Sequence, residues 1–497
     1  MNRSRPFRNA ALVVGAVVSS LAAGEARAET LIQALVQAYQ TNPQILAARD
    51  LLRSTDEQVA QAISLLRPTA TATFTGGFAT GTNSSVIQQN LRTPAEQTTG
   101  SRTRPASASL TLTQPIYRGG KEYAEIKRAE NTIRAQRARL QNTEQDIFFQ
   151  VVTAYMNVVR DEAIVRLRAN NVGVLQRQLQ AVRDRFNVGE VTRTDVAQAE
   201  AAVAGAEAQR VLAVGNYESS KANYTNLVGH PPQRLSEPRP PAFLPAQFGF
   251  MMSTAKSTNP TIIAATYDEF AARHNVRSII GELLPQVSLN GSVSRSLDPG
   301  ATPGLRSDSA SLTVSVTVPL YESGSVYSRT RAAKQTVFQR GNDLAQARRS
   351  VEELATRAWQ TLQAARASVA SFQAQSRANG VALEGVRQEN QAGLRTVLDV
   401  LTAQQTLLDS QVSLVSSRRD MIVASFQVAQ AMGKLTAVDL RLPVLIYDAT
   451  AYYRAIKYLP IGTGPSMGAP PPKPGVPPQP NPGATSSSQP PRPQAGK

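Results

Sequence analysis

The chain has 497 residues, a formal net charge of +17, no cysteine and an aromatic content of only 5%. Without cysteine there is no disulfide framework, no thiolate zinc site and no residue for a lipid anchor. The positive charge does not indicate a nucleic-acid partner, because the lysines and arginines are scattered and form no basic and aromatic motif. Few bulky residues per turn favour long helices that pack through small side chains.

The first 28 residues are predicted to be a secretory signal peptide. Three arginines precede an apolar run over residues 10–21, and Ala26-Arg27-Ala28 has the small-x-small pattern of a cleavage site. The run is shorter than the 20 or so residues of a transmembrane helix. We therefore expect an exported chain that begins near Glu29.

Four motifs occur twice in the same order, which predicts two copies of one structural unit, residues 29–234 and 246–434. The first motif recurs after 217 positions and the others after 204, so the first copy is longer by about 13 residues between residues 68 and 115. The pairs are Thr41-Asn42-Pro43 with Thr258-Asn259-Pro260, Pro115-Ile116-Tyr117 with Pro319-Leu320-Tyr321, Gly189 and Asp195 with Gly393 and Asp399, and Gly229 with Gly433.

Each copy is predicted to begin with a helix and to continue with two strands. Alternation of apolar residues with Ser or Thr predicts strands at about 68–79 and 106–116, and at about 285–296 and 309–320. About ten residues is the length with which a tilted strand crosses a bilayer. The segments between them, 76–105 and 295–308, are rich in Gly, Ser, Thr, Asn and Pro and are predicted to be exposed loops.

Two long helices are predicted to complete each copy, at about 120–187 and 193–229, and at about 324–391 and 395–433. At 1.5 Å per residue the first helix of each pair would be about 100 Å long. Heptad spacing of apolar residues is typical of coiled coils, and taken alone it favours a structural rod. The heptad positions include Ile126, Ile133, Leu140, Ile147 and Ala154, and Val337, Leu344, Val351 and Ala358.

Two segments follow the second copy. Residues 435–460 are a segment outside both copies. Residues 461–497 are dense in Pro, Gly, Ser and Gln, a composition that cannot bury a core, so they are predicted to be a disordered tail.

Four strands are too few to close a membrane barrel, since the smallest have about eight. An open sheet edge in lipid leaves N–H and C=O groups unpaired, at a cost of several kcal/mol each. Strands that span a membrane must therefore come from several chains, eight strands from two chains or twelve from three. The alternative is a periplasmic coiled-coil scaffold without a pore, but no segment is available to cover the apolar faces of its hairpins.

These features together resemble the TolC-type outer membrane channel proteins of tripartite efflux pumps and type I secretion systems. The resemblance covers about residues 29–434. It rests on the duplicated layout, the Asn-Pro helix starts, the Pro-x-Tyr junctions and the two tip sequences between the long helices, residues 185–196 and 391–401. It implies a mostly helical α+β fold. It also implies a homotrimer with one 12-stranded outer membrane β-barrel, four strands per chain, continued by a periplasmic α-helical barrel with coiled-coil tips. Residues 435–460 would be an equatorial, periplasmic segment.

The resemblance also implies a location, partners and a function. The protein would lie in the outer membrane, in contact with its lipid, and extend into the periplasm. Its partners would be a periplasmic adaptor and an inner-membrane transporter. It would serve as the exit duct for small molecules such as drugs, for proteins, or for both, and the sequence leaves that choice open.

The tips between the long helices are the candidate gate. Gly189 and Gly393 are expected to end a helix in the left-handed conformation. By resemblance, Asp399 forms a ring of three carboxylates that narrows the entrance and favours cations, while Arg395 links the inner tip to Thr194-Asp195 on the outer tip.

Other interpretations of the tip residues remain open. Asp195 and Asp399 are expected about one and a half turns into the return helices, but each can instead be a first-turn carboxylate that stabilises a helix N-terminus. Two positions depart from the family pattern. A second pore aspartate is Thr402 here, and a tyrosine that helps to hold the closed state is Asn390.

Other candidate residues are few. Tyr117 and Tyr321 are expected to form an aromatic rim where the barrel meets the periplasm, or else to pack at the join of sheet and helix. His230 and His274 have no Cys or acidic pair at ligand spacing, so no metal site is expected. There is no phosphate-binding loop or hydrolase elbow, and we expect neither a cofactor nor an enzyme.

Overall fold

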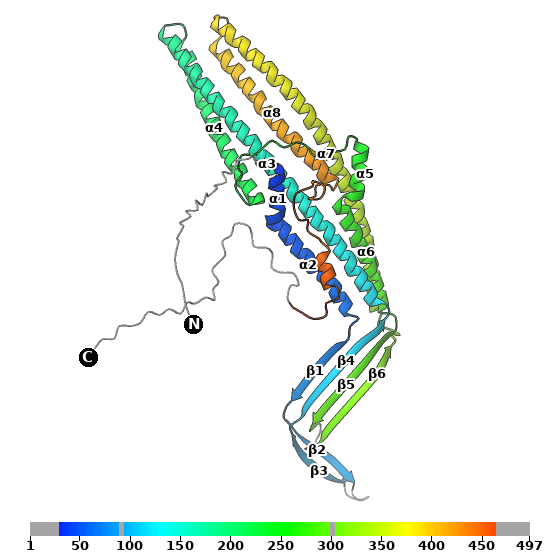
Figure 1. The fold of residues 1–497 in the computed structure, drawn as a ribbon. Helices are drawn as coiled ribbons and strands as arrows, with labels where there is room; N and C mark the ends of the chain where they lie inside the picture. Colours follow the sequence, from blue (N-terminus) through cyan, green and yellow to red (C-terminus); the bar gives the residue numbers. More distant parts are fainter. Residues whose placement is uncertain (1–28, 89–93, 299–303, 464–497) are drawn as a thin grey trace, which may run out of the picture.

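The computed structural model describes residues 29–88, 94–298 and 304–463. The predicted signal peptide, residues 1–28, and most of the predicted tail, residues 461–497, lie outside the described residues. The molecule is elongated, with a β-sheet at one end and two long helical hairpins that reach the other end (Figure 1). The mostly helical fold with a few antiparallel strands is confirmed.

Each half of the chain begins with two helices rather than the single predicted one, and an Asn-Pro pair separates them. The helices are α1 (Leu31–Thr41) and α2 (Pro43–Ser64), and α5 (Phe248–Thr258) and α6 (Pro260–Gly281). Asn42 caps α2 by accepting a hydrogen bond from the Gln44 amide, and its own Nδ2 donates to the carbonyl of Leu227 at 3.0 Å. Asn259 does the same at the start of α6, with Ala431 as its acceptor at 3.1 Å. The Asn-Pro motif therefore docks each N-terminal pair onto the end of a long helix.

Four strands form one antiparallel sheet in the order β1-β4-β5-β6. They are β1 (Thr69–Gly76), β4 (Ala106–Arg118), β5 (Gln286–Leu297) and β6 (Arg306–Thr317). Successive side chains point to opposite faces, so the register gathers the apolar residues on one face and Ser and Thr on the other. One apolar row, for example, joins Ala72, Leu110, Val293 and Ala310.

The prediction that residues 76–105 form a loop is wrong. They contain a second hairpin of β2 (Ala79–Gln88) and β3 (Pro94–Thr103), which extends beyond the sheet (Figure 1). Its strands are mostly polar, so their sequence has no apolar face to reveal them, and backbone pairing alone defines them. β1 also ends at Gly76 instead of 79, and β6 covers 306–317 instead of 309–320.

The long helices are α3 (Lys121–Asn187) with α4 (Arg193–Val228), and α7 (Ser325–Gln391) with α8 (Val397–Ala431). α3 and α7 have 67 residues each, and both follow a glycine in the left-handed conformation, Gly120 with φ +73° and Gly324 with φ +76°. Among the described residues, we find no helix that is both long and apolar enough to cross a membrane.

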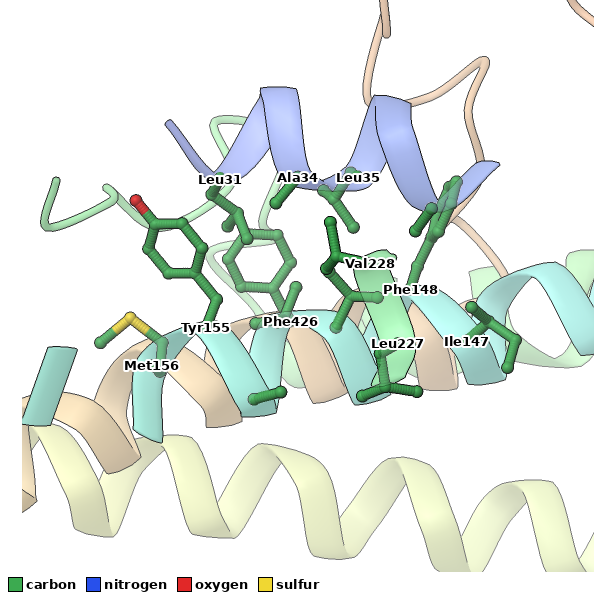
Figure 2. Packing of buried hydrophobic residues seen from close by; sticks show 14 of the residues in the cluster. Leu31, Ala34, Leu35, Ile147, Phe148, Tyr155, Met156, Leu227, Val228 and Phe426 are labelled. Atoms are coloured by element: carbon green, nitrogen blue, oxygen red, sulfur yellow. The ribbon is translucent and has the colours of Figure 1, made fainter. Parts of the chain in front are cut away.

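The main hydrophobic core lies at mid-length, where α1 packs across α3 (Figure 2). Leu31 and Leu35 of α1 face Phe148 and Tyr155 of α3 in this core. Glu29 is fixed beside it, because Tyr224 Oη donates to its carboxylate at 2.6 Å and Tyr155 Oη to its carbonyl at 2.8 Å. The short helix α9 (Ala451–Ile456) packs on α2.

Candidate functional site

The two helix tips lie at the end of the molecule opposite to the sheet (Figure 1). Gly189 has φ +81° and Gly393 has φ +80°, a conformation that costs glycine little because it lacks a Cβ. The amide of Glu190 donates to the carbonyl of Arg185, and that of Leu394 to Glu389, both at 2.9 Å. These bonds satisfy carbonyl groups that the end of a helix leaves open.

The return helices begin with identical capping boxes. Thr192 donates its amide and hydroxyl to Asp195 Oδ2 at 2.8 and 2.7 Å, and the Asp195 amide donates back to Thr192 Oγ1 at 3.3 Å. Thr396 and Asp399 repeat this arrangement at 3.0, 2.8 and 3.2 Å. The hydrogen bonds from each threonine lower the pKa of its aspartate, so both carboxylates are charged at neutral pH.

The capping boxes correct the predicted position of the aspartates. Asp195 and Asp399 are the third residues of α4 and α8 and lie in the first turn, not one and a half turns along. Both aspartates use Oδ2 for the cap, so the capping role is the same at the two tips. It gives no reason to assign a pore role to one aspartate rather than the other. A pore role for Asp399 would be additional and stays a prediction.

Arg395 is bonded within its own tip. Its Nε donates to Glu389 Oε2 at 2.9 Å, and Asn390 Nδ2 donates to the Arg395 carbonyl at 2.7 Å. Within the described part of a single chain, no hydrogen bond joins Arg395 to Thr194 or Asp195. Asn390, where the family pattern has the latch tyrosine, is buried and holds the turn of its own hairpin. The link between the tips remains a prediction for the assembled protein.

A polar contact that the sequence did not reveal joins the two hairpins. Gln404 Nε2 on α8 donates to Asn171 Oδ1 on α3 at 3.2 Å, and Arg387 on α7 donates to Gln404 Oε1 at 2.9 Å. Nearby, a cavity of about 610 Å³ opens between α4 and α8, with Thr402 in its lining. Gln and Asn are frequent on these helices, so no pattern could have singled out this pair.

At the end of the molecule next to the sheet, the carboxylate of Glu282, which follows α6, bonds to residues at the starts of α3 and α7. Glu282 Oε1 accepts from Lys121 Nζ at 2.8 Å, and its Oε2 accepts from Arg329. These two cations lower the pKa of Glu282, the hydrogen bond from Arg329 most of all. Tyr117 and Tyr321 lie near this junction, Tyr117 in β4 and Tyr321 after β6, and both are exposed. Their exposure is compatible with a rim and argues against tight packing within one chain.

Among the described residues, no group of three or more His, Cys, Asp or Glu is arranged to hold a metal ion. His230 instead lies 3.5 Å from the Glu29 carboxylate, and burial together with Arg277 and Lys127 lowers the pKa of His274. The candidate functional surfaces are the charged helix tips and the apolar face of the sheet.

Comparison with known proteins agrees with this description. The profile of the outer membrane efflux protein family matches residues 34–230 and 251–434. Outer membrane efflux protein BepC of Brucella suis biovar 1 is 34% identical over 450 residues, which cover 90% of this chain and 94% of BepC. Outer membrane protein TolC of Escherichia coli K12 is 25% identical over 435 residues, which cover 83% of this chain and 84% of TolC.

A solved structure shows the same fold. The outer membrane channel CmeC of Campylobacter jejuni superimposes with a TM-score of 0.70 at 16% identity, over 86% of this chain and 89% of CmeC. The fold is thus that of outer membrane channels. The chain belongs to the outer membrane efflux protein family. It is a protein of the outer membrane that extends into the periplasm.

Proposed function

We propose that three copies of this chain form one exit duct, with a shared 12-stranded β-barrel in the outer membrane and one helical tube in the periplasm. The four-stranded sheet is the observation that supports this most directly. Its apolar face is exposed in the single chain, with Leu312, Val314 and Val316 each more than 60% exposed. A soluble protein would cover such a face, whereas lipid satisfies it.

The sheet edges support the sharing of the barrel among chains. β1 and β6 are the outer strands of the sheet, so each has one row of backbone groups without a neighbour in the sheet. Within lipid these groups need partners. Pairing of β6 with β1 of the next chain supplies them and closes the barrel after three copies, in line with the family.

The tips are proposed to be the periplasmic gate. Three-fold symmetry repeats any side chain that faces the axis, so Asp399 would present three carboxylates at the entrance and attract cations. Arg395 would hold the closed state by linking the inner tip to Thr194-Asp195, in exchange for its bond to Glu389. The cap at Asp399 uses only Oδ2, so Oδ1 is available to face the pore.

The partners follow from the same proposal. A passive duct has no energy source of its own, so an inner-membrane transporter must drive export, and a periplasmic adaptor must join the two. Membership of an efflux family supports small toxic molecules as cargo, and protein cargo is the alternative. The duct contacts its cargo loosely, so the transporter selects it.

The proposal is tested by purification and reconstitution. The protein should require detergent to leave the outer membrane, light scattering should give three copies, and the complex should form channels in planar bilayers. A monodisperse monomer in detergent would contradict the shared barrel. Release without detergent and absence of conductance would instead support a periplasmic scaffold.

A further inference from the structure

Three charged residues interrupt the apolar face of the sheet at the end farthest from the helices. The register aligns Phe74, Ala108, Arg295 and Asp308 in one row across the four strands. Arg306 lies two residues from Asp308 on β6 and therefore on the same face. Residues of this face point to lipid in the proposed barrel, so these charges need partners at the membrane surface.

The three residues form one compact group, called here the arginine clamp. Arg295 Nε donates to Asp308 Oδ1 at 2.7 Å, and Arg306 Nη2 donates to Asp308 Oδ2 at 2.7 Å. Asp308 thus holds two guanidinium groups side by side, and the group keeps a net charge of +1. A guanidinium has five N–H donors, more than this single carboxylate can accept, and all three side chains are about half exposed.

The clamp lies at one border of the apolar band, and the tyrosine rim lies at the other. A β-bulge lies between Pro115 and Tyr117 on β4, so the spacing is counted on β5, where Arg295 in the clamp row and Val287 opposite Tyr117 are eight positions apart. At about 3.3 Å per residue and a tilt of about 40°, this spacing crosses about 20 Å, near the roughly 25 Å height of the apolar band in such barrels.

Aromatic side chains mark the same border as the clamp. Phe74 and Phe78 are 79% and 85% exposed, and the Arg104 guanidinium is 5.5 Å from the centroid of the Phe78 ring. Aromatic rings are enriched at membrane interfaces. The clamp is therefore at the level of lipid headgroups.

We propose that Arg295 and Arg306 bind the phosphate groups of lipid A, the phosphorylated glycolipid of the outer leaflet. The inference rests on the proposed function, which puts the helices in the periplasm and this end of the strands at the cell surface. Guanidinium forks match phosphate oxygens. Asp308 aligns both forks beforehand, which lowers the ordering cost of binding. The clamp faces lipid, so neither cargo in the lumen nor an adaptor in the periplasm can reach it.

The test uses the full assembled protein in detergent, with bisphosphoryl lipid A as the probe and native mass spectrometry as the readout. The double variant R295Q/R306Q should bind lipid A at least about fivefold more weakly than wild type, because two charge-assisted contacts are lost at each clamp. The control R348Q/R349Q removes the same charge from an exposed part of α7 and should bind like wild type. Dephosphorylated lipid A should bind wild type as weakly as lipid A binds R295Q/R306Q.

Several outcomes would overturn the inference: equal affinity of wild type and R295Q/R306Q, an equal loss in the control, or no discrimination against dephosphorylated lipid A. Preference for phosphatidylglycerol, or displacement by inorganic phosphate at equal concentration, would overturn it as well. Copy number and conductance are read on the same samples. A wild-type chain that does not assemble contradicts the proposed function, whereas an assembled channel without lipid A selectivity contradicts only this inference.

Discussion

In the described part of the chain, Asp56 on α2 has a buried carboxylate without hydrogen-bond partners, which is an unfavourable environment for its charged form. Its side chain is 1% exposed, and both carboxylate oxygens lack a hydrogen-bond partner within the described residues. Arg137 Nη2 on α3 approaches Oδ1 only to 3.9 Å, beyond hydrogen-bond distance. Burial raises the pKa of Asp56 from 3.8 to about 6, while the charge of Arg137 lowers it and that of Glu57 raises it by smaller amounts.

The raised pKa predicts that Asp56→Asn stabilises the protein at neutral pH. The folded state binds more protons than the unfolded state between pH 3.8 and about 6, so stability falls as pH rises through this window. At about 1.4 kcal/mol per pKa unit, the full penalty above pH 6 is about 3 kcal/mol. The attraction to Arg137 already acts in this pKa, and with partial screening by solvent we expect a gain of about 1–2 kcal/mol.

The assay is unfolding by guanidinium chloride in detergent, followed by far-UV circular dichroism at pH 4 and pH 7.5. Asp56→Asn should raise the free energy of unfolding at pH 7.5 and leave it nearly unchanged at pH 4. Asp50→Asn is the matched control, because Asp50 lies on the same helix with its side chain 71% exposed, and it should change little at either pH. If Asp56→Asn lowers the stability at pH 7.5, attraction to Arg137 outweighs burial and the reasoning is refuted.

Three further predictions concern the tips and the sheet junction. Asp399→Ala should reduce cation selectivity and weaken block by trivalent cations from the periplasmic side in planar bilayers. Asp195→Ala removes an identical cap and should change selectivity less. Arg395→Ser should raise single-channel conductance or open probability without lowering the trimer yield. Gly119→Ala should reduce the yield of assembled protein, because its Cβ would lie 2.1 Å from a carbonyl oxygen of α6. Gly120→Ala, with a similar positive φ but nothing within 4 Å, adds only backbone strain of about 1–3 kcal/mol and should assemble better.

Each of these predictions has a clear contrary result. Equal selectivity in Asp399→Ala and Asp195→Ala would mean that Asp399 does not face the pore. If Arg395→Ser has wild-type conductance and the assembly is intact, Arg395 is only a solvated charge at the tip that bonds Glu389. Equal yields of Gly119→Ala and Gly120→Ala would show that the contact between the β4–α3 turn and α6 tolerates a shift of the backbone.

The long helices and the turns between them were predictable because their signals are local. Heptad positions such as Ile133 and Leu344 are buried, and the glycines at positions 189 and 393 turn the chain where the pattern placed them. The strands of the sheet were predictable because one face is apolar and the other carries Ser and Thr. In each case a short stretch of sequence contains the information that decides the structure.

Features that depend on contacts between distant segments were not predictable. The β2-β3 hairpin is defined by backbone pairing of polar strands, and Glu282 became a junction only when α6 met the starts of α3 and α7. The repeated Asn-Pro motif was seen as a helix start, but its docking on the ends of α4 and α8 depends on residues more than 170 positions away. The proposed partners of Arg395 and the proposed ring of Asp399 likewise depend on neighbouring chains, which a single chain does not contain.

The most direct test of the shared barrel is a disulfide between its open edges. The chain has no cysteine, so an introduced pair reports only on its own contact. Ala72→Cys on β1 is combined in turn with a cysteine at Ala310, Leu312, Val314 or Val316 on the same face of β6. On oxidation in the outer membrane, at least one pair should give a covalent species of three chains on denaturing gels, and the single-cysteine controls should stay monomeric. Failure of every pair to link neighbouring chains, or a closed species of two chains, would contradict the proposal that three chains build one barrel.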